Sequence, residues 1–473
     1  MARRQGTGKG GKGSHGSGHS ENQGGSRPKH KERGKGGPQR KPKPRPGPQQ
    51  QRTDGPRSRT AVSRRHGLLQ PPSGQAAALL DSYGKILDKA VPLPAKHRRD
   101  TPLAVRELSR LLTRDRAELS SDYMRSPRMI SAYLRYFLPW NLYRLSLLLP
   151  GLAPLLTLDT GGTVADLGSG PLTSAQALWL AMDQWRGFGL DIHCMDRSQR
   201  IMTQGRAVLN ELMRAAPGPL PPAGAIDRDG EKRSSPWRVF LDHGPLHKGL
   251  AGVGKPLDLV LAVNVLNEAL RMETGRRGAG EAVSGFAAKL LARIKLPGEQ
   301  RPGEQGLGGQ LLLVEPGTRS GGEMVVRMRE AALEQGFSPL SPCTHAEPCP
   351  LAGRDMWCHF RTGTEHAPVW LRSLSKAAGL GKESASLSFV LLGRSAAPRE
   401  SGRARVLSNA IRVGGARAWY GCSRHGLLLV SAHKGGELRQ GEQVDYELDP
   451  AGARDEKSGA LIALAGGEAG KNA

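Results

Sequence analysis

The spacing of apolar residues changes twice along the chain and predicts three kinds of structure. Between residues 67 and 155 the spacing is helical. Three segments carry this spacing: 74–91, 101–119 and 126–149. From 156 to 395 short apolar runs alternate with helical patterns, and from 403 to 450 short runs alternate with glycine-containing turns. We therefore expect a helical domain, an α/β domain and a small antiparallel β unit, followed by a flexible tail over 451–473.

The α/β part contains six short runs that are apolar enough to be buried strands. They are 163–168, 190–196, 237–242, 257–263, 311–317 and 386–393. Buried strands that alternate with helices are typical of a mainly parallel sheet with helices on both faces. Right-handed crossovers bring the carboxyl ends of such strands to one edge, where ligands bind. We expect the functional site at this edge.

Positive charge is concentrated at the beginning of the chain. Residues 1–66 contain 18 Lys and Arg against 3 Asp and Glu, and the 473-residue chain has a formal net charge of +26. A segment with so few apolar residues cannot bury enough surface to fold, so we expect a disordered basic tail. Its charge suits the phosphates of nucleic acid, and we favour an RNA-rich partner over a tail that only increases solubility.

The sequence also limits the expected location. No run is long and apolar enough for a membrane span, and the N-terminal residues lack the apolar core of a signal peptide and the apolar face of a transit helix. We expect a cytoplasmic protein with no membrane partner. In a reducing compartment, clustered cysteines are metal ligands or redox groups more often than disulfides.

A glycine turn follows the first predicted strand of the α/β part. The run V-A-D-L-G-S-G-P places Asp166, Gly168, Ser169 and Gly170 where a strand meets a helix. Glycine permits a tight turn and a close ligand approach, and the start of the helix offers free N–H groups to a carboxylate or phosphate. Such turns occur in many folds, so the pattern alone is a weak signal.

Two polar residues end neighbouring predicted strands at the same edge. Asp196 follows Gly170 by 26 residues and stands where a carboxylate can accept both ribose hydroxyls of a nucleoside. Asn264 ends another strand, where it can meet the adenine or the amino-acid part of a ligand. These positions favour a nucleoside-containing cofactor; the alternatives are a different nucleotide ligand or an empty relic of such a site. The run 262–270 lacks the Asn-Pro-Pro-aromatic tetrad of amino methyltransferases, and the catalytic residues stay unknown.

Three of the five cysteines lie within sixteen residues. Cys343, Cys349 and Cys358 have the spacing C-x5-C-x8-C, and Cys422 follows 64 residues later in the predicted β unit. Four thiolates from these two regions could enclose one metal centre and fasten the β unit to the sheet. Zinc commonly uses more closely paired cysteines, whereas wider spacing suits an iron-sulfur cluster at least as well. The spacing leaves the two metals about equally favoured, with free structural cysteines as a third and weaker interpretation, and His345 and His359 keep a mixed zinc site open.

Seven motifs follow one another between residues 133 and 392, within a longer region of resemblance over roughly 132–448: YLRYFLPWNLYR, VADLGSGPLT, LDLVLAVNVLNEAL, LLLVEPGTRSGG, PCTHAEPCPL, DMWCHF and SFVLL. Their order resembles the methyltransferase-like assembly factors of the small ribosomal subunit, a family of mitochondria and bacteria. The most specific part is the cysteine pattern that runs into Trp357-Cys358-His359-Phe360. The resemblance leaves out the basic tail.

The resemblance implies a class I S-adenosylmethionine-dependent methyltransferase (Rossmann-like) fold, with the glycine turn as its first cofactor motif. It implies a [4Fe-4S] cluster whose ligands are Cys343, Cys349, Cys358 and Cys422. It also implies binding of the small-subunit rRNA during ribosome assembly. We expect a monomer that either methylates this RNA or serves as a non-catalytic assembly factor, with zinc in place of the cluster as the other choice of metal.

Overall fold

The computed structural model describes residues 67–113, 126–219, 235–266, 279–298, 308–394, 402–432 and 436–466. The predicted basic tail over 1–66 lies outside these residues, as does the last part of the predicted flexible tail, 467–473. The described residues all belong to one compact unit.

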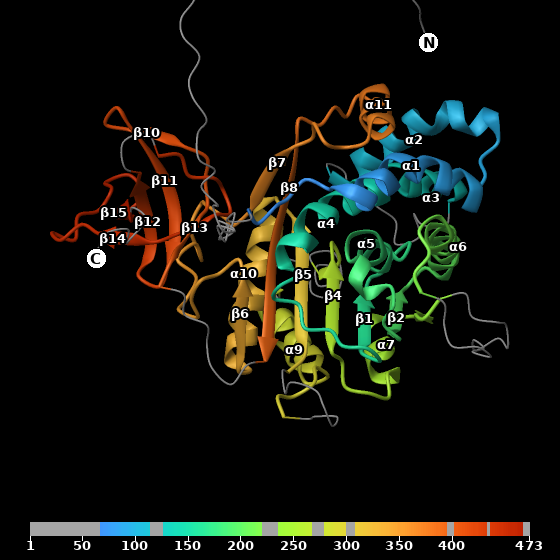
Figure 1. Ribbon diagram of the computed structural model, residues 1–473, viewed down its shortest axis with the longest axis horizontal. Coiled ribbons are helices and arrows are strands. Elements are labelled where there is room, and N and C mark those ends of the chain that lie inside the picture. The colour runs from blue at the N-terminus through green and yellow to red at the C-terminus, as the bar shows by residue number, and fades with distance from the viewer. Residues whose placement is uncertain are drawn as a thin grey trace, which may run out of the picture. The chain divides into compact units, whose positions relative to one another are not determined.

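A mainly parallel sheet of eight strands lies at the centre of the described chain (Figure 1). The strands follow the order β3-β2-β1-β4-β5-β8-β6, and β7 pairs with β8. Their bounds are β1 Thr163–Leu167, β2 Asp191–Asp196, β3 Arg238–His243, β4 Leu259–Val263, β5 Gln310–Pro316, β6 Phe337–Ser341, β7 Phe360–Gly363 and β8 Ser384–Arg394.

Strands β1 to β5 are parallel, whereas β8 is antiparallel to β5, β6 and β7. Parallel strands in the order 3-2-1-4-5 form the centre of a doubly wound sheet, with ligands at their carboxyl ends. The antiparallel β8 between β5 and β6 completes the sheet of a class I methyltransferase. The predicted fold class is therefore confirmed.

Side chains of these strands alternate between two hydrophobic cores. Val164 of β1 and Leu312 of β5 pack on one face, while their neighbours Ala165 and Leu311 pack on the other. All four are buried, because successive side chains of a strand point to opposite faces and helices cover both. This explains why the strands are continuously apolar in the sequence.

The helices divide between the two cores. The first face carries α1 Gly74–Ala90, α2 Ala95–Thr113, α3 Pro127–Ala132, α4 Leu138–Leu152, α5 Thr173–Ala181, α6 Gln199–Ala215 and α11 Val369–Ala377, with a π-helical turn η2 Tyr133–Phe137 and a 3-10 turn η3 Asp183–Trp185. The second carries α7 Leu246–Gly252, α9 Ala279–Leu291 and α10 Arg319–Glu334. Tyr136, Trp140 and Tyr143 are buried in the first core, so the predicted helical domain packs into the same core as the sheet.

A second sheet follows the first along the chain (Figure 1). Its strand order is β13-β9-β11-β12-β15-β14, and β10 pairs with β11. The bounds are β9 Ala404–Val406, β10 Ile411–Val413, β11 Ala416–Ser423, β12 Gly426–Ser431, β13 Gln443–Val444, β14 Tyr446–Leu448 and β15 Leu461–Ala465. Its pairs are antiparallel except β12 with β15.

The last strand corrects one prediction. β15 lies within the segment 451–473, for which the sequence predicted a flexible tail, yet it pairs with both β12 and β14. Its sequence LIALA has one β-branched residue, so its propensity to form a strand is modest. Pairing with β12, about thirty residues earlier in the chain, stabilises it, and local patterns do not reveal such a pairing. The β unit therefore extends to Ala465.

Candidate cofactor edge and cysteine cavity

A tight turn joins β1 to α5 at the carboxyl edge of the parallel sheet. Gly168 and Gly170 adopt positive φ angles of 60° and 53°, which other residues rarely adopt. A Cβ atom at Gly168 would lie 2.1 Å from Cγ2 of Val265, just beyond the end of β4. Glycine is therefore needed at 168 both for the backbone conformation and for the close approach of the neighbouring strand end.

Asp196, the last residue of β2, holds this turn in place. Its Oδ2 accepts a hydrogen bond from the N–H of Gly170 at 2.9 Å, and its Oδ1 accepts one from the N–H of Ser198 at 2.8 Å. Burial raises the pKa of the Asp196 carboxyl, while these two N–H groups oppose the shift. Each carboxylate oxygen can accept a second hydrogen bond, so Asp196 retains acceptor capacity for the hydroxyls of a ligand.

Asp166 lies in β1 beside the turn and is 1% exposed. Ser174 donates a hydrogen bond to its Oδ1 at 2.6 Å. Within the described part of the chain, the buried Oδ2 of Asp166 and the buried Oγ of Ser169 have no hydrogen-bond partner. Burial raises the pKa of Asp166 to about 7; the Ser174 hydrogen bond opposes the shift and the nearby Asp196 adds to it. Buried polar atoms normally find partners, so these two atoms suit a polar ligand at this edge.

The ends of β4 and β5 each add a further polar group. Asn264 is partly exposed, has a positive φ of 56° and donates its backbone N–H to the carbonyl of Val314 at 2.8 Å. Glu315 of β5 is 1% exposed and accepts a hydrogen bond from the N–H of Leu266 at 2.9 Å. Because β1 lies between β2 and β4, the structure brings the predicted positions 166–170, 196 and 264 to one edge of the sheet.

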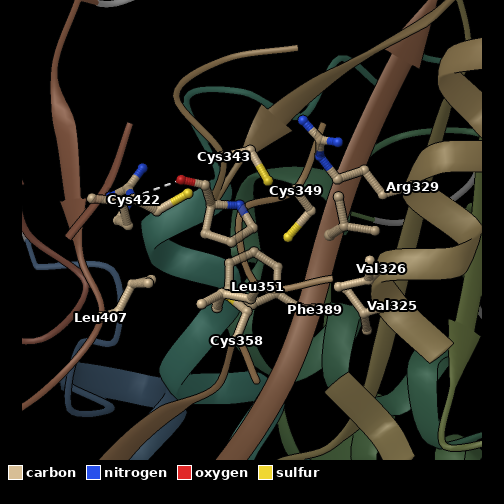
Figure 2. Close-up of a pocket in the computed structure, with 13 residues that line it drawn as sticks. Val325, Val326, Arg329, Cys343, Cys349, Leu351, Cys358, Phe389, Leu407 and Cys422 are labelled. Atoms are coloured by element: carbon tan, nitrogen blue, oxygen red, sulfur yellow. Dashed lines mark hydrogen bonds between the residues drawn. The ribbon is translucent and has the colours of Figure 1, made fainter. Parts of the chain in front are cut away.

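The four thiols that were predicted as ligands line a single cavity (Figure 2). Cys343 and Cys349 lie in the loop after β6, Cys358 lies two residues before β7, and Cys422 lies on β11 of the second sheet. The cavity volume, measured for the centre of a water-sized sphere, is about 30 Å³. Its lining includes residues of both sheets, so the cavity lies between them. The fifth thiol, Cys194, is buried in β2 outside the cavity.

Two arginines line the same cavity. Arg329 comes from α10 and Arg405 from β9. Burial raises the pKa of Cys349, Cys358 and Cys422; neighbouring thiols add to this shift and Arg329 opposes it. The guanidinium groups thus favour thiolates in a place where burial disfavours them.

Two histidines lie close to the thiols. Nε2 of His345 is 3.2 Å from Sγ of Cys422, and His345 is 2% exposed. Burial lowers the pKa of His345 to about 4, and Arg329 adds to this shift. Nδ1 of His359 lies 3.1 Å from the carbonyl oxygen of Trp357, and the His359 ring stacks on the Trp357 ring. His345 therefore contacts the thiol cavity, whereas one nitrogen of His359 is engaged with the backbone.

Four thiols, a neighbouring histidine and two cationic side chains lie around one cavity, and thiols in this number are the donor type that a thiolate-ligated centre uses. Over the described ranges, no group of three or more His, Cys, Asp or Glu side chains is arranged so that it could hold a metal ion. The thiols are thus gathered around one cavity without the arrangement of a closed ion site.

Comparison with known families bears on this cavity. Residues 305–430 match the family model described as Rsm22, mitochondrial small ribosomal subunit Rsm22. The match shows that this region is similar to the Rsm22 family. It contains all four cysteines of the cavity and excludes the glycine turn at 168–170. The Rsm22 match therefore covers the last strands of the first sheet, the cysteine-rich loop and the first strands of the second sheet, and it confirms the resemblance to small-subunit factors.

Solved structures give a fold-level likeness. A precorrin-6y C5,15-methyltransferase from Geobacter metallireducens is 12% identical, with 50% of this chain and 82% of that chain covered, at a TM-score of 0.28. A proposed class I S-adenosylmethionine-dependent methyltransferase from Listeria monocytogenes is 12% identical, with coverages of 68% and 89% and a TM-score of 0.29. At TM-scores this low, the likeness adds no argument for the fold, which therefore rests on the strand order. The comparison with curated proteins gives no match.

None of the described helices is long and apolar enough to cross a membrane.

Sequence reasoning missed three groups near these sites. Glu315 ends a buried strand in the run LLLVEPG, and its place at a carboxyl strand end was a usable signal. Arg329 and Arg405 carried no such signal, because charged residues on a helix and on a short strand are usually exposed. Both are buried because they line the cavity that the four cysteines surround.

Proposed function

We propose that this protein is a methyltransferase-like factor of the small ribosomal subunit, which binds S-adenosylmethionine at the carboxyl edge and a [4Fe-4S] cluster in the cysteine cavity. One observation carries the proposal: the Rsm22 family region contains the four cysteines that surround one cavity. The family description names the small ribosomal subunit, so its rRNA is the partner that we propose.

The edge of the sheet offers a set of groups for the first ligand. Bound S-adenosylmethionine supplies a methyl group on a positively charged sulfur. Asp196 would accept hydrogen bonds from the ribose hydroxyls, and Gly168 lets the backbone approach closely. Oδ2 of Asp166 and Oγ of Ser169 would meet polar atoms of the ligand, and Asn264 would meet its adenine or amino-acid part. The contribution of these residues is positioning.

The cysteine cavity offers the ligands of an iron-sulfur cluster. Cubane clusters are held by four cysteine thiolates, which is the number of thiols around this cavity. Structural zinc uses the same donors but prefers closely paired cysteines, and the nearest pair here, Cys343 and Cys349, is separated by five residues. When bound, the cluster would link the loop after β6 to β11 of the second sheet.

A second function is a non-catalytic assembly factor that uses the methyltransferase fold as an rRNA-binding platform. The observation in its favour is that the Rsm22 match includes the cysteines but not the glycine turn. In this case the cofactor edge would be dispensable and the cysteine cavity would not.

S-adenosylmethionine binding is tested by calorimetry on the full chain and on Asp196→Asn. The substitution turns one oxygen into a donor, so it disturbs either the Gly170 contact or the ribose contact, and we expect binding to weaken by about tenfold or more. Asp183→Asn, at an exposed position of η3, is the matched control. If the wild-type protein binds no S-adenosylmethionine, this half of the proposal is wrong.

The role of the cofactor is tested on ribosomes. Small-subunit rRNA from cells that carry Asp196→Asn is compared with wild-type rRNA for methylated nucleotides, and subunit assembly is followed by sedimentation. Loss of one methylated position supports an enzyme. Normal methylation and normal assembly in Asp196→Asn, together with failed assembly in Cys358→Ala, support the non-catalytic factor.

The metal is tested by anaerobic purification followed by iron, sulfide and zinc analysis. We expect iron and sulfide in equal amounts in the wild-type protein and in Cys194→Ala, whose thiol lies outside the cavity. Cys422→Ala should lose both. One equivalent of zinc without sulfide would show that the centre is zinc and not an iron-sulfur cluster.

The location, the oligomeric state and the RNA contacts stay predictions. The matching family is described as mitochondrial, whereas we predict a cytoplasmic monomer whose tail over residues 1–66 binds rRNA. Cell fractionation and the sedimentation of the purified protein test the first two. Deletion of the tail should weaken RNA binding and reduce its dependence on salt.

A further inference from the structure

The cysteine cavity contains more positive charge than its surroundings balance. Arg329 is 1% exposed and Arg405 is 7% exposed, and both line the cavity that the four thiols surround. In Figure 2, Arg329 lies beside Cys343 and Cys349. Arginine is rarely buried to this extent unless it has a partner of opposite charge.

The hydrogen-bond partners of Arg405 are neutral. Its Nε donates to the carbonyl of Pro342 at 2.7 Å, and its Nη1 donates to the carbonyl of Gly441 at 2.6 Å. Within the described part of the chain, it forms no ion pair with a carboxylate. The side chains beside Arg405 in the cavity lining that can carry a negative charge are therefore the thiols.

Arg329 has one carboxylate partner. Its Nη2 donates to the carbonyls of His345 at 3.0 Å and Glu347 at 2.7 Å, and its Nη1 donates to Glu330 at 2.5 Å. Glu330 also accepts the backbone N–H of Cys349 at 3.2 Å. The two buried arginines thus have one carboxylate partner in total, Glu330. When the thiols are neutral, one of the two positive charges therefore has no negative partner.

We propose that Arg329 and Arg405 are positioning residues that balance the charge of an anionic, thiolate-ligated centre and make the cavity selective for it. A centre of charge +2 with four thiolate ligands has a net charge of about −2, and this holds for a [4Fe-4S] cluster and for zinc alike. The inference rests on the proposed thiolate-ligated centre but not on which of the two it is.

The two arginines come from different parts of the fold. Arg329 stands on α10, beside the parallel sheet, and Arg405 stands on β9, next to Cys422 across the β9–β11 pair. An anionic centre attracts both and so draws the second sheet towards the first. Without the centre, the same charges are buried close together and destabilise this junction.

The charge balance predicts that one substitution acts with opposite sign in the two forms of the protein. Arg405→Met removes a buried charge, so the chelator-treated full chain should unfold at a higher urea concentration than the wild type. The loaded protein, reconstituted with iron and sulfide or with zinc alone, should release its metal on the order of a hundredfold faster. The lost hydrogen bonds to Pro342 and Gly441 affect both forms and cancel in the difference between them.

Two variants separate charge from packing. Arg405→Lys keeps the charge and should retain the metal nearly as well as the wild type. Arg186→Met is the matched control, because Arg186 is 4% exposed and donates to the carbonyls of Trp179 and Leu180 away from the cavity. It should change the stability of both forms equally. If Arg405→Met does not fold, Arg329→Met gives the same comparison.

The outcomes distinguish this inference from the proposed function. A wild-type protein that takes up neither metal overturns the proposed centre. If the wild-type protein holds a centre and both Arg405→Met and Arg329→Met release it at the wild-type rate, the proposed role of the two arginines is wrong. The proposed centre itself then still stands. Equal destabilisation of both forms by Arg405→Met would also overturn it, because that result describes an ordinary packing residue.

Discussion

Nε2 of His345 lies 3.2 Å from Sγ of Cys422, although the two residues are 77 positions apart in the sequence. The contact joins the cysteine-rich loop after β6 to β11 of the second sheet. It places a possible nitrogen ligand beside a proposed sulfur ligand, so the two roles can be separated by substitution.

Substitution of His345 tests whether the centre has four sulfur ligands or a mixed set. We expect His345→Ala to retain iron and sulfide close to the wild-type amounts, because four thiols already line the cavity, whereas Cys422→Ala loses them. Metal and sulfide analysis of the two purified variants makes the comparison. If His345→Ala loses one equivalent of zinc and Cys343→Ala does not, the histidine is a ligand and the four-cysteine assignment is wrong.

Glycine at 168 is predicted to be essential for stability. In Gly168→Ala the new methyl group would overlap Val265 and the backbone would keep a positive φ, so the free energy of unfolding should fall by about 2 to 5 kcal/mol. Gly252→Ala is the control, since a Cβ there meets no atom within 4 Å, and its effect should stay within about 0.5 kcal/mol. Urea unfolding of both variants measures the difference; equal effects would show that the turn relaxes.

Some of this arrangement could be predicted because it follows from local patterns. Continuously apolar strands separated by helical segments require a sheet covered on both faces, and the carboxyl ends of its strands require Asp166, Asp196 and Asn264 to share an edge. The three thiols of the loop were visible as a group, and Cys422 entered as the remaining thiol of the predicted β unit.

Other features depend on contacts between segments that are distant in the sequence. Arg405 of β9 is buried where it donates to the carbonyl of Pro342, in the loop after β6, and β15 is a strand because it pairs with β12. Neither residue type nor periodicity carries this information. The packing of the N-terminal helices into the core of the sheet has the same origin, since an apolar helix face does not reveal its partner.

Asp166 should make the stability of the ligand-free protein depend on pH. Its pKa is about 7 in the folded chain and near 4 in the unfolded chain, so between these values the folded state holds a proton that the unfolded state has lost. The free energy of unfolding therefore falls as the pH rises from about 4 to 7. Asp166→Asn should remove most of this fall, measured by urea unfolding across that range.

The matched control for this pH dependence is Asp183→Asn, whose side chain is exposed and should leave the slope unchanged. Because burial also raises the pKa of Asp196, a smaller fall of the same sign should persist in Asp166→Asn and disappear in the double variant. An unchanged slope in Asp166→Asn would mean that Asp166 is not the group that titrates.

Lys382 should produce the opposite dependence at alkaline pH. Its Nζ lies 5.5 Å from the ring centre of Trp140 and 5.9 Å from that of Tyr136, and burial lowers its pKa to about 8, with Arg144 adding to the shift. Between about 8 and 10.5 the unfolded chain keeps the proton that the folded chain has lost, so the free energy of unfolding rises with pH by up to about 1.4 kcal/mol for each unit. Lys382→Met should abolish this rise, and Lys376→Met, at an exposed position of α11, should not. The same slope in both variants would exclude Lys382 as its source.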